Sequence, residues 1–185
     1  MTRYARGFGA VCVVVALMTG CGDDKHPAPK VQATNPPGSV SSAEKEKALA
    51  TLKQRGMSID GAGLYSAAAA GSFELVNLYL ETGIDVNARD AHQRTALQVV
   101  AAGGNVPLGE LLLSKGADVN AVDENGTSAV MDAAWEGNLA MVRLLAERGA
   151  QLSIKNKSGY SPLRAARDRN HKEVIDLLVS KGATE

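Results

Sequence analysis

Residues 95–104 read Thr-Ala-Leu-Gln-Val-Val-Ala-Ala-Gly-Gly, and the pattern of this stretch returns along the chain. Gly104 has counterparts 33 residues away on either side, at Gly71 and Gly137. A second series of glycines has the same period and consists of Gly83, Gly116, Gly149 and Gly182. A constant period of this length is typical of stacked repeats rather than of one closed globular core.

Each repeat predicts two helices and a loop. Thr95 is suited to cap the first helix, because its hydroxyl can satisfy a free amide of the first turn. Three apolar residues then share one helical face: Leu97, Val100 and Ala101. Gly104 ends this helix, since the left-handed conformation costs least at glycine. A second helix, rich in leucine, runs to Gly116, and a polar loop leads into the next copy. Its leucines are Leu108, Leu111, Leu112 and Leu113.

These patterns resemble the ankyrin repeat. Copies start with Thr95-Ala96-Leu97 or Ser161-Pro162-Leu163, and a typical copy ends with Gly116-Ala117-Asp118-Val119-Asn120. The copies cover residues 64–87, 95–120, 128–153 and 161–182. The resemblance implies an all-α ankyrin-repeat solenoid with about four full repeats and a partial N-terminal capping helix.

Both ends of the array show the features of caps. Residues 43–60 are expected to form the second helix of an incomplete leading repeat, with Leu49 and Leu52 facing the stack. In the last copy Asn170 replaces the glycine between the helices, and asparagine also tolerates positive φ. The last repeat is polar, as a terminal repeat requires. Its basic residues are Arg164, Arg167, Arg169, Lys172 and Lys181.

The N-terminus reads as an export signal. Arg3 and Arg6 precede an apolar run that is too short for a permanent membrane span, so residues 1–20 are expected to be a signal peptide. The run ends in Met18-Thr19-Gly20-Cys21, which resembles a bacterial lipobox, and Cys21 is then lipidated. The alternative is an ordinary cleaved signal with an incidental cysteine. By the same resemblance, Gly22 after the cysteine favours the outer membrane over the inner one.

Residues 21–42 are expected to be a lipidated, proline-containing linker, and residues 43–185 the ankyrin-repeat domain. This division places the domain on the periplasmic side of the bacterial cell envelope. Cys12 would leave with the signal and Cys21 would carry lipid, so the domain keeps no thiol. We expect it to be monomeric.

Charge and motif spacing argue against several other functions. The chain has 20 basic and 20 acidic residues, so it lacks the basic excess of a nucleic-acid binder. Its three histidines are not spaced as metal ligands, and its glycine-rich stretches lack the lysine of a phosphate-binding loop. Ser128 and Ser161 fit helix starts better than nucleophiles. We therefore expect no cofactor, metal or catalytic site.

The resemblance implies a protein-binding surface made of loop tips and first helices. The loop tips contribute His92, Arg94, Glu124, Asn125, Thr127, Lys157, Ser158 and Tyr160. The first helices contribute Trp135, Glu136, Asp168 and Arg169. Trp135, the only tryptophan, is predicted to be a hot spot flanked by Tyr160, because large rigid rings are enriched in such sites. The alternative is that Trp135 packs against the next repeat.

The sequence therefore predicts a membrane-tethered periplasmic module that binds a partner protein. Two roles remain open: an immunity protein that neutralises a secreted toxin or effector, and a scaffold or stabiliser of a periplasmic enzyme such as a peroxide-defence enzyme. A third reading is a structural envelope protein that binds cell wall. It would need a glycan site rich in aromatic residues.

Overall fold

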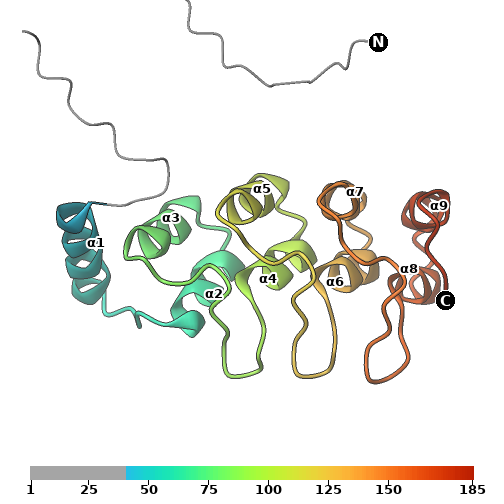
Figure 1. The fold of residues 1–185 in the computed structure, drawn as a ribbon, viewed down its shortest axis with the longest axis horizontal. Coiled ribbons are helices and arrows are strands. Elements are labelled where there is room, and N and C mark those ends of the chain that lie inside the picture. The colour runs from blue at the N-terminus through green and yellow to red at the C-terminus, as the bar shows by residue number, and fades with distance from the viewer. Residues whose placement is uncertain (1–40) are drawn as a thin grey trace, which may run out of the picture. The chain divides into compact units, whose positions relative to one another are not determined.

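A computed structural model describes residues 41–185, and this part of the chain contains nine helices. The helices after α1 (Ser42–Gln54) form four pairs. The first helices are α2 (Gly61–Ala69), α4 (Ala96–Gly103), α6 (Ala129–Glu136) and α8 (Pro162–Asp168). The second helices are α3 (Phe73–Glu81), α5 (Val106–Ser114), α7 (Leu139–Glu147) and α9 (Lys172–Ser180). First and second helices form two rows, and long loops extend beyond the first row (Figure 1). The predicted all-α solenoid with four repeats is confirmed.

The hydrophobic core lies between the two rows. Leu97, Val100 and Ala101 are fully buried on α4, as their shared face predicted. On α5 only Leu108 and Leu112 are fully buried, whereas Leu111 and Leu113 are partly exposed. Leu108 and Leu112 lie four positions apart and therefore share one face of the helix. The four leucines predicted for this helix thus divide into two core residues and two flanking ones.

The inter-helix stop residues have left-handed backbones. Gly71, Gly104 and Gly137 have φ values of 66°, 66° and 76°. Asn170 takes the same place in the last repeat with φ 59°, as predicted from its tolerance of positive φ. Each of these residues ends a first helix and lets the chain reverse into the second row.

The leading helix is shorter than the sequence predicted. Residues 43–60 were expected to be helical, but α1 ends at Gln54. Asp60 instead caps α2, because its carboxylate accepts a hydrogen bond from the Gly63 amide at 2.8 Å. α1 packs against α3, with Leu52 buried and Leu49 partly buried, so it occupies the position of a second helix (Figure 1).

Gly63 is required by close packing in the first pair. The Tyr79 hydroxyl donates to the Ser58 carbonyl oxygen at 2.7 Å, directly beside this glycine. A Cβ atom on Gly63 would collide with both the Ser58 carbonyl and the Tyr79 ring. Tyr79 is fully buried, so its ring packs in the core of this helix pair.

Side chains at one position of each repeat join that repeat to the next. Asn87 Oδ1 accepts from the Asp118 amide at 2.7 Å, and Asn120 Oδ1 accepts from the Gln151 amide at 2.8 Å. Ser153 continues the series, since its hydroxyl accepts from the Thr184 amide at 2.9 Å. The same bridge therefore fixes the register of successive repeats as far as the C-terminal segment.

The predicted signal peptide (1–20), the lipidation of Cys21 and most of the linker (21–42) lie outside the described residues. Among the helices of residues 41–185, none has the length and apolar character needed to cross a bilayer.

Candidate protein-binding surface

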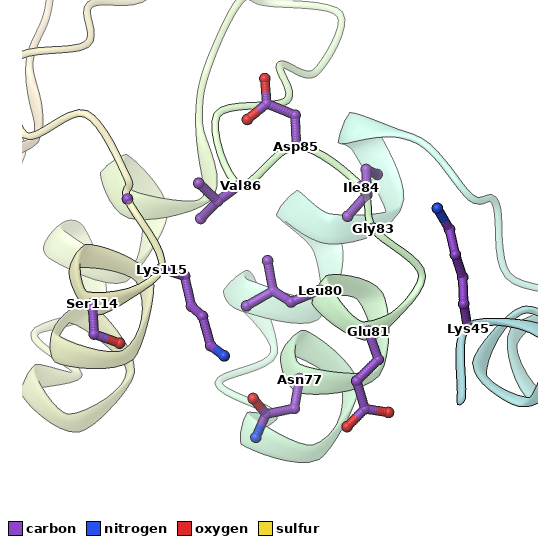
Figure 2. A pocket seen from close by; sticks show the side chains of 11 residues that line it. Lys45, Asn77, Leu80, Glu81, Gly83, Ile84, Asp85, Val86, Ser114 and Lys115 are labelled. Atoms are coloured by element: carbon purple, nitrogen blue, oxygen red, sulfur yellow. The ribbon is translucent and has the colours of Figure 1, made fainter. Parts of the chain in front are cut away.

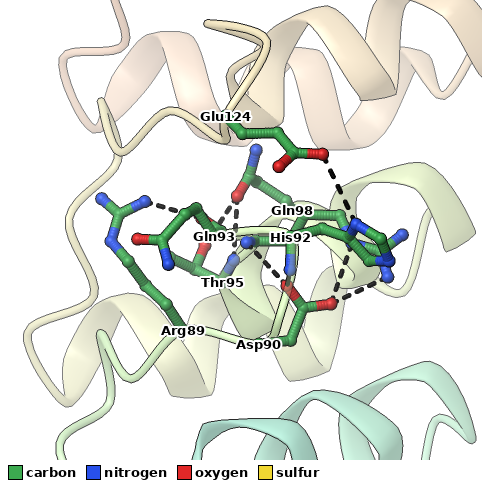
Figure 3. Close-up of polar contacts among 8 residues, drawn as sticks. Arg89, Asp90, His92, Gln93, Thr95, Gln98 and Glu124 are labelled. Atoms are coloured by element: carbon green, nitrogen blue, oxygen red, sulfur yellow. Dashed lines mark hydrogen bonds and ion pairs between the residues drawn. The ribbon is translucent and has the colours of Figure 1, made fainter.

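The long loops have a common internal bracing. The Asp90 carboxylate accepts the amide of His92 at 2.9 Å (Figure 3). It also accepts the amide of Arg94 at 2.9 Å and pairs with the Arg94 guanidinium at 2.8 Å. Asp123 and Asn156, at the same position of the next two loops, accept the corresponding amides. This bracing holds each loop tip in a defined shape, so its remaining side chains are presented to one side.

Neighbouring loop tips contact each other. The Glu124 amide donates to the His92 carbonyl oxygen at 3.4 Å, and the Glu124 carboxylate lies 3.4 Å from His92 Nδ1 (Figure 3). One repeat further on, the Lys157 amide donates to the Asn125 carbonyl oxygen at 2.9 Å. The predicted loop-tip residues therefore form a strip that runs across three repeats.

Gln98 links the first helix of one repeat to the loop of the next. Its side-chain oxygen accepts from the Thr95 amide at 2.8 Å, and its amide nitrogen donates to the Thr127 carbonyl at 2.7 Å. Thr95 occupies the predicted N-cap position of α4, where its side chain and that of Gln98 form a capping box. In α6 the corresponding position is Met131, and the Ser128 hydroxyl there is buried without a partner within the described residues.

Trp135 lies on the surface at the end of α6 and is 36% exposed. Its ring meets Tyr160 edge to face, with 6.4 Å between the ring centroids and 74° between the planes. The Arg169 guanidinium stacks over the indole at 4.3 Å, and Arg164 stacks over Tyr160 at 4.9 Å. Tyr160, which was predicted to flank Trp135, and Arg169, another predicted binding residue, are both in contact with Trp135, and together they hold the ring in one orientation.

A groove of about 350 Å³ opens beside this aromatic pair. It lies between α6, α8 and two successive loops. Its lining residues are Thr127, Met131, Asp132, Trp135, Asn156, Ser158, Tyr160 and Ala165. Four of the predicted binding residues therefore share one hollow: Thr127, Trp135, Ser158 and Tyr160.

Asp132 supplies the one carboxylate among the residues that line this groove. Burial raises its pKa from 3.8 to about 7, and the negative charges of Asp123 and Glu136 contribute to the rise. Arg94 acts in the opposite direction but does not cancel the effect of burial. The carboxylate is therefore close to its protonation midpoint at neutral pH.

Other predicted residues lie on the same strip without lining the groove. Arg94 stacks over Tyr65 at 4.4 Å in addition to its pair with Asp90. Asp168 lies 3.9 Å from Arg164, and Glu136 is exposed at the end of α6. His92, Glu124, Asn125 and Lys157 are exposed on the loop tips.

Sequence reasoning missed Met131, Asp132 and Tyr65. The signal for Asp132 was present in the 33-residue register, which aligns it with Val99 and Ala165. A carboxylate at a position filled by apolar residues in both flanking repeats stands out as an exception. Tyr65 is only partly buried, and the Arg94 guanidinium stacks over its ring.

A wider hollow of about 1000 Å³ lies on the side of the second helices (Figure 2). It is bordered by α1, α3 and α5 and by the loop that follows α3. Lys45, Glu81 and Lys115 line it together with Leu80 and Val86 (Figure 2). Across residues 41–185, no three His, Cys, Asp or Glu side chains are grouped so as to hold a metal ion.

The family model for ankyrin repeats, in three copies, matches residues 64–156, which is just over half of the chain. The chain therefore belongs to the ankyrin-repeat family. The match covers α2 to α7, and the α8–α9 pair continues the same register beyond it. No curated protein matches the chain. Ankyrin repeats generally bind other proteins, and the family is typically a non-enzymatic interaction scaffold.

Proposed function

We propose that the chain binds a partner protein through the loop strip and the first-helix row, with Trp135 at the centre of the contact. The observation that carries this proposal is the exposed indole held between Arg169 and Tyr160 at the edge of a groove. An aromatic ring that is already fixed loses little conformational entropy when a partner covers it.

The surroundings of Trp135 have the composition of a binding hot spot. Arg169, Glu136 and Lys157 provide a charged and exposed rim, while Met131 and Tyr160 provide apolar contact area. Interfaces commonly combine a central aromatic or arginine anchor with a polar rim of this kind.

Binding would take place at a membrane surface. The apolar run before Cys21 supports an exported chain that is held by a lipid on this cysteine, faces the periplasm and is carried by the outer membrane. The linker that follows contains four prolines between residues 27 and 37, a composition typical of spacers between an anchor and a folded domain.

The experiment is affinity capture from an envelope extract with the immobilised full chain. Trp135→Ala should lose the specific partner. Phe73→Ala should retain it, because Phe73 is also an aromatic residue, is 49% exposed, and lies on α3 in the other row. Capture that is unaffected by Trp135→Ala would overturn the proposed surface.

The captured partner then separates the two roles within this function. An immunity protein would abolish the activity of the captured protein when the complex forms. A scaffold or stabiliser would leave that activity intact and slow its loss on heating. Assaying the partner with and without a stoichiometric amount of the chain tests both possibilities.

A further inference from the structure

The groove beside Trp135 contains a carboxylate that lacks a charged partner. Asp132 lines the groove with Met131 and Tyr160. Within residues 41–185, the ion pairs and side-chain hydrogen bonds of the molecule do not include this carboxylate. Asp132 is partly buried, and partial removal of a charge from water is costly unless a partner of opposite sign compensates it.

The electrostatic environment of Asp132 favours a positive charge. Asp123, from the preceding loop, and Glu136, from the same helix, both disfavour the ionised carboxylate. Arg94 is the one cation with a resolved influence on Asp132, and it is already paired with Asp90 at 2.8 Å. The arginines nearest the aromatic pair, Arg164 and Arg169, stack over the rings of Tyr160 and Trp135. The groove therefore complements an incoming cation.

An apolar side chain would suit the free protein better at this position. Val99 and Ala165 occupy it in the adjacent repeats, so the repeat geometry itself does not need a carboxylate. Departures from the local rules of a fold are expected where a residue serves function. Asp132 is such a departure, and it lies next to the exposed tryptophan.

We propose that the partner inserts one lysine or arginine side chain into this groove, with its charged end at Asp132. This inference rests on the proposed function and specifies the chemistry of the partner. A long basic side chain has an apolar stem, which fits against Met131 and Trp135, and a charged end, which compensates the carboxylate. A hollow of about 350 Å³ has room for one such side chain, since it lies at the lower end of the range for ligand pockets.

The test is selection of peptides from a random phage-displayed library on the immobilised full chain at pH 8. Phage that also bind the Trp135→Ala chain are removed. The selected peptides should share a lysine or arginine, and replacing it with glutamine should weaken binding at least tenfold. Asp132→Asn should weaken the same peptides at least tenfold. Asp176→Asn, an identical change on the exposed face of α9, should have no effect.

Acidification gives a second readout with a predictable sign. Protonation of Asp132 removes its charge, so the selected peptides should bind the native chain more weakly at pH 5.5 than at pH 8. Peptide binding to the Asp132→Asn chain should not show this part of the pH dependence. The groups that act on Asp132, namely Asp123, Glu136 and Arg94, are the same in both chains, so the difference between the chains isolates Asp132.

The outcomes distinguish failure of the basic-residue inference from failure of the proposed protein-binding function. Peptides that depend on Trp135 but share no basic residue, or that bind Asp132→Asn as well as the native chain, would overturn the basic-residue inference and leave the binding surface standing. A selection that recovers no peptide dependent on Trp135 would contradict both.

Discussion

Trp135 combines exposure with a fixed orientation. About one third of the residue is accessible, while Arg169 covers one face of the ring and Tyr160 packs against it edge to face. The carbonyl oxygen of Trp135 lies 3.0 Å from His171 Nε2, so the backbone is also held by the following repeat. Truncation at Cβ removes the ring but leaves this backbone contact, and its effect on folding should therefore be modest.

Asp132 predicts a pH-dependent stability difference. Its pKa is about 7 in the folded chain and 3.8 as an ordinary aspartate, so between these values the folded state binds the proton and the unfolded state does not. The contribution of Asp132 to the free energy of unfolding therefore falls as pH rises from about 4 to about 7. Asp132→Asn should raise the free energy of unfolding by about 1 kcal/mol or more at pH 8.

At pH 4 most of this stability difference between the Asp132→Asn and native chains should be gone, because the carboxyl is then protonated in the folded state and close to half protonated in the unfolded state. Urea titrations at the two pH values measure the difference. An Asp132→Asn chain that is equally or less stable at pH 8 would show that the carboxylate is well solvated.

At the scale of helices, α4 and α6 differ in how their N-termini are closed. Gln98 accepts from the Thr95 amide and donates to the next loop, whereas Met131 does neither and the Ser128 hydroxyl stays unpaired within the described residues. Met131→Gln should restore both bonds, since the Tyr160 carbonyl stands where the Thr127 carbonyl stands one repeat earlier.

We expect Met131→Gln to stabilise the chain by roughly 0.5–1.5 kcal/mol, the usual contribution of a hydrogen bond. Chemical denaturation measures this change. A destabilised Met131→Gln chain would mean that apolar contact in the groove outweighs the cap. Gln98→Met is the matched reverse substitution and should destabilise by a similar amount.

The burial pattern of α5 predicts unequal effects of two leucine truncations. Leu112→Ala should lower the free energy of unfolding by about 2–5 kcal/mol, because Leu112 is fully buried between the rows. Leu111→Ala should lower the free energy of unfolding clearly less than Leu112→Ala, since Leu111 is partly exposed. Equal losses in thermal or urea unfolding would contradict the assignment of the buried face.

The sequence predicted the repeat period, the helix pairs and the stop residues, because these depend on local glycine and apolar patterns. It did not predict the end of α1 at Gln54 or the capping role of Asp60. Both residue types occur within helices as well as beside them, so the local sequence does not distinguish the two positions. The contact of Trp135 with Tyr160 and Arg169 was partly predictable from the repeat register. Asp132 was overlooked, because its burial and its charge environment depend on neighbours from three repeats.

At the scale of the whole molecule, the repeats form one continuous stack in which each contacts its neighbours (Figure 1). Such an array offers an extended surface rather than an enclosed chamber.

The proposed tether predicts a change in cell fractionation. Cys21→Ser removes the sulfur that would carry the lipid, so the chain should move from the membrane fraction to the soluble periplasmic fraction. Immunoblotting of separated fractions measures the shift. Cys12→Ser is the matched control and should leave the distribution unchanged. An unaltered membrane fraction for Cys21→Ser would contradict lipidation at this cysteine.

The most direct test of partner binding through Trp135 is one comparison of affinity and stability. The dissociation constant of the captured partner is measured for the native, Trp135→Ala and Phe73→Ala chains, alongside their free energies of unfolding. We predict that Trp135→Ala weakens binding by about 2 kcal/mol or more, roughly 30-fold, while it lowers stability by about 1 kcal/mol. Phe73→Ala should bind like the native chain. A folded Trp135→Ala chain with native affinity would show that Trp135 is a packing residue and that the partner binds elsewhere.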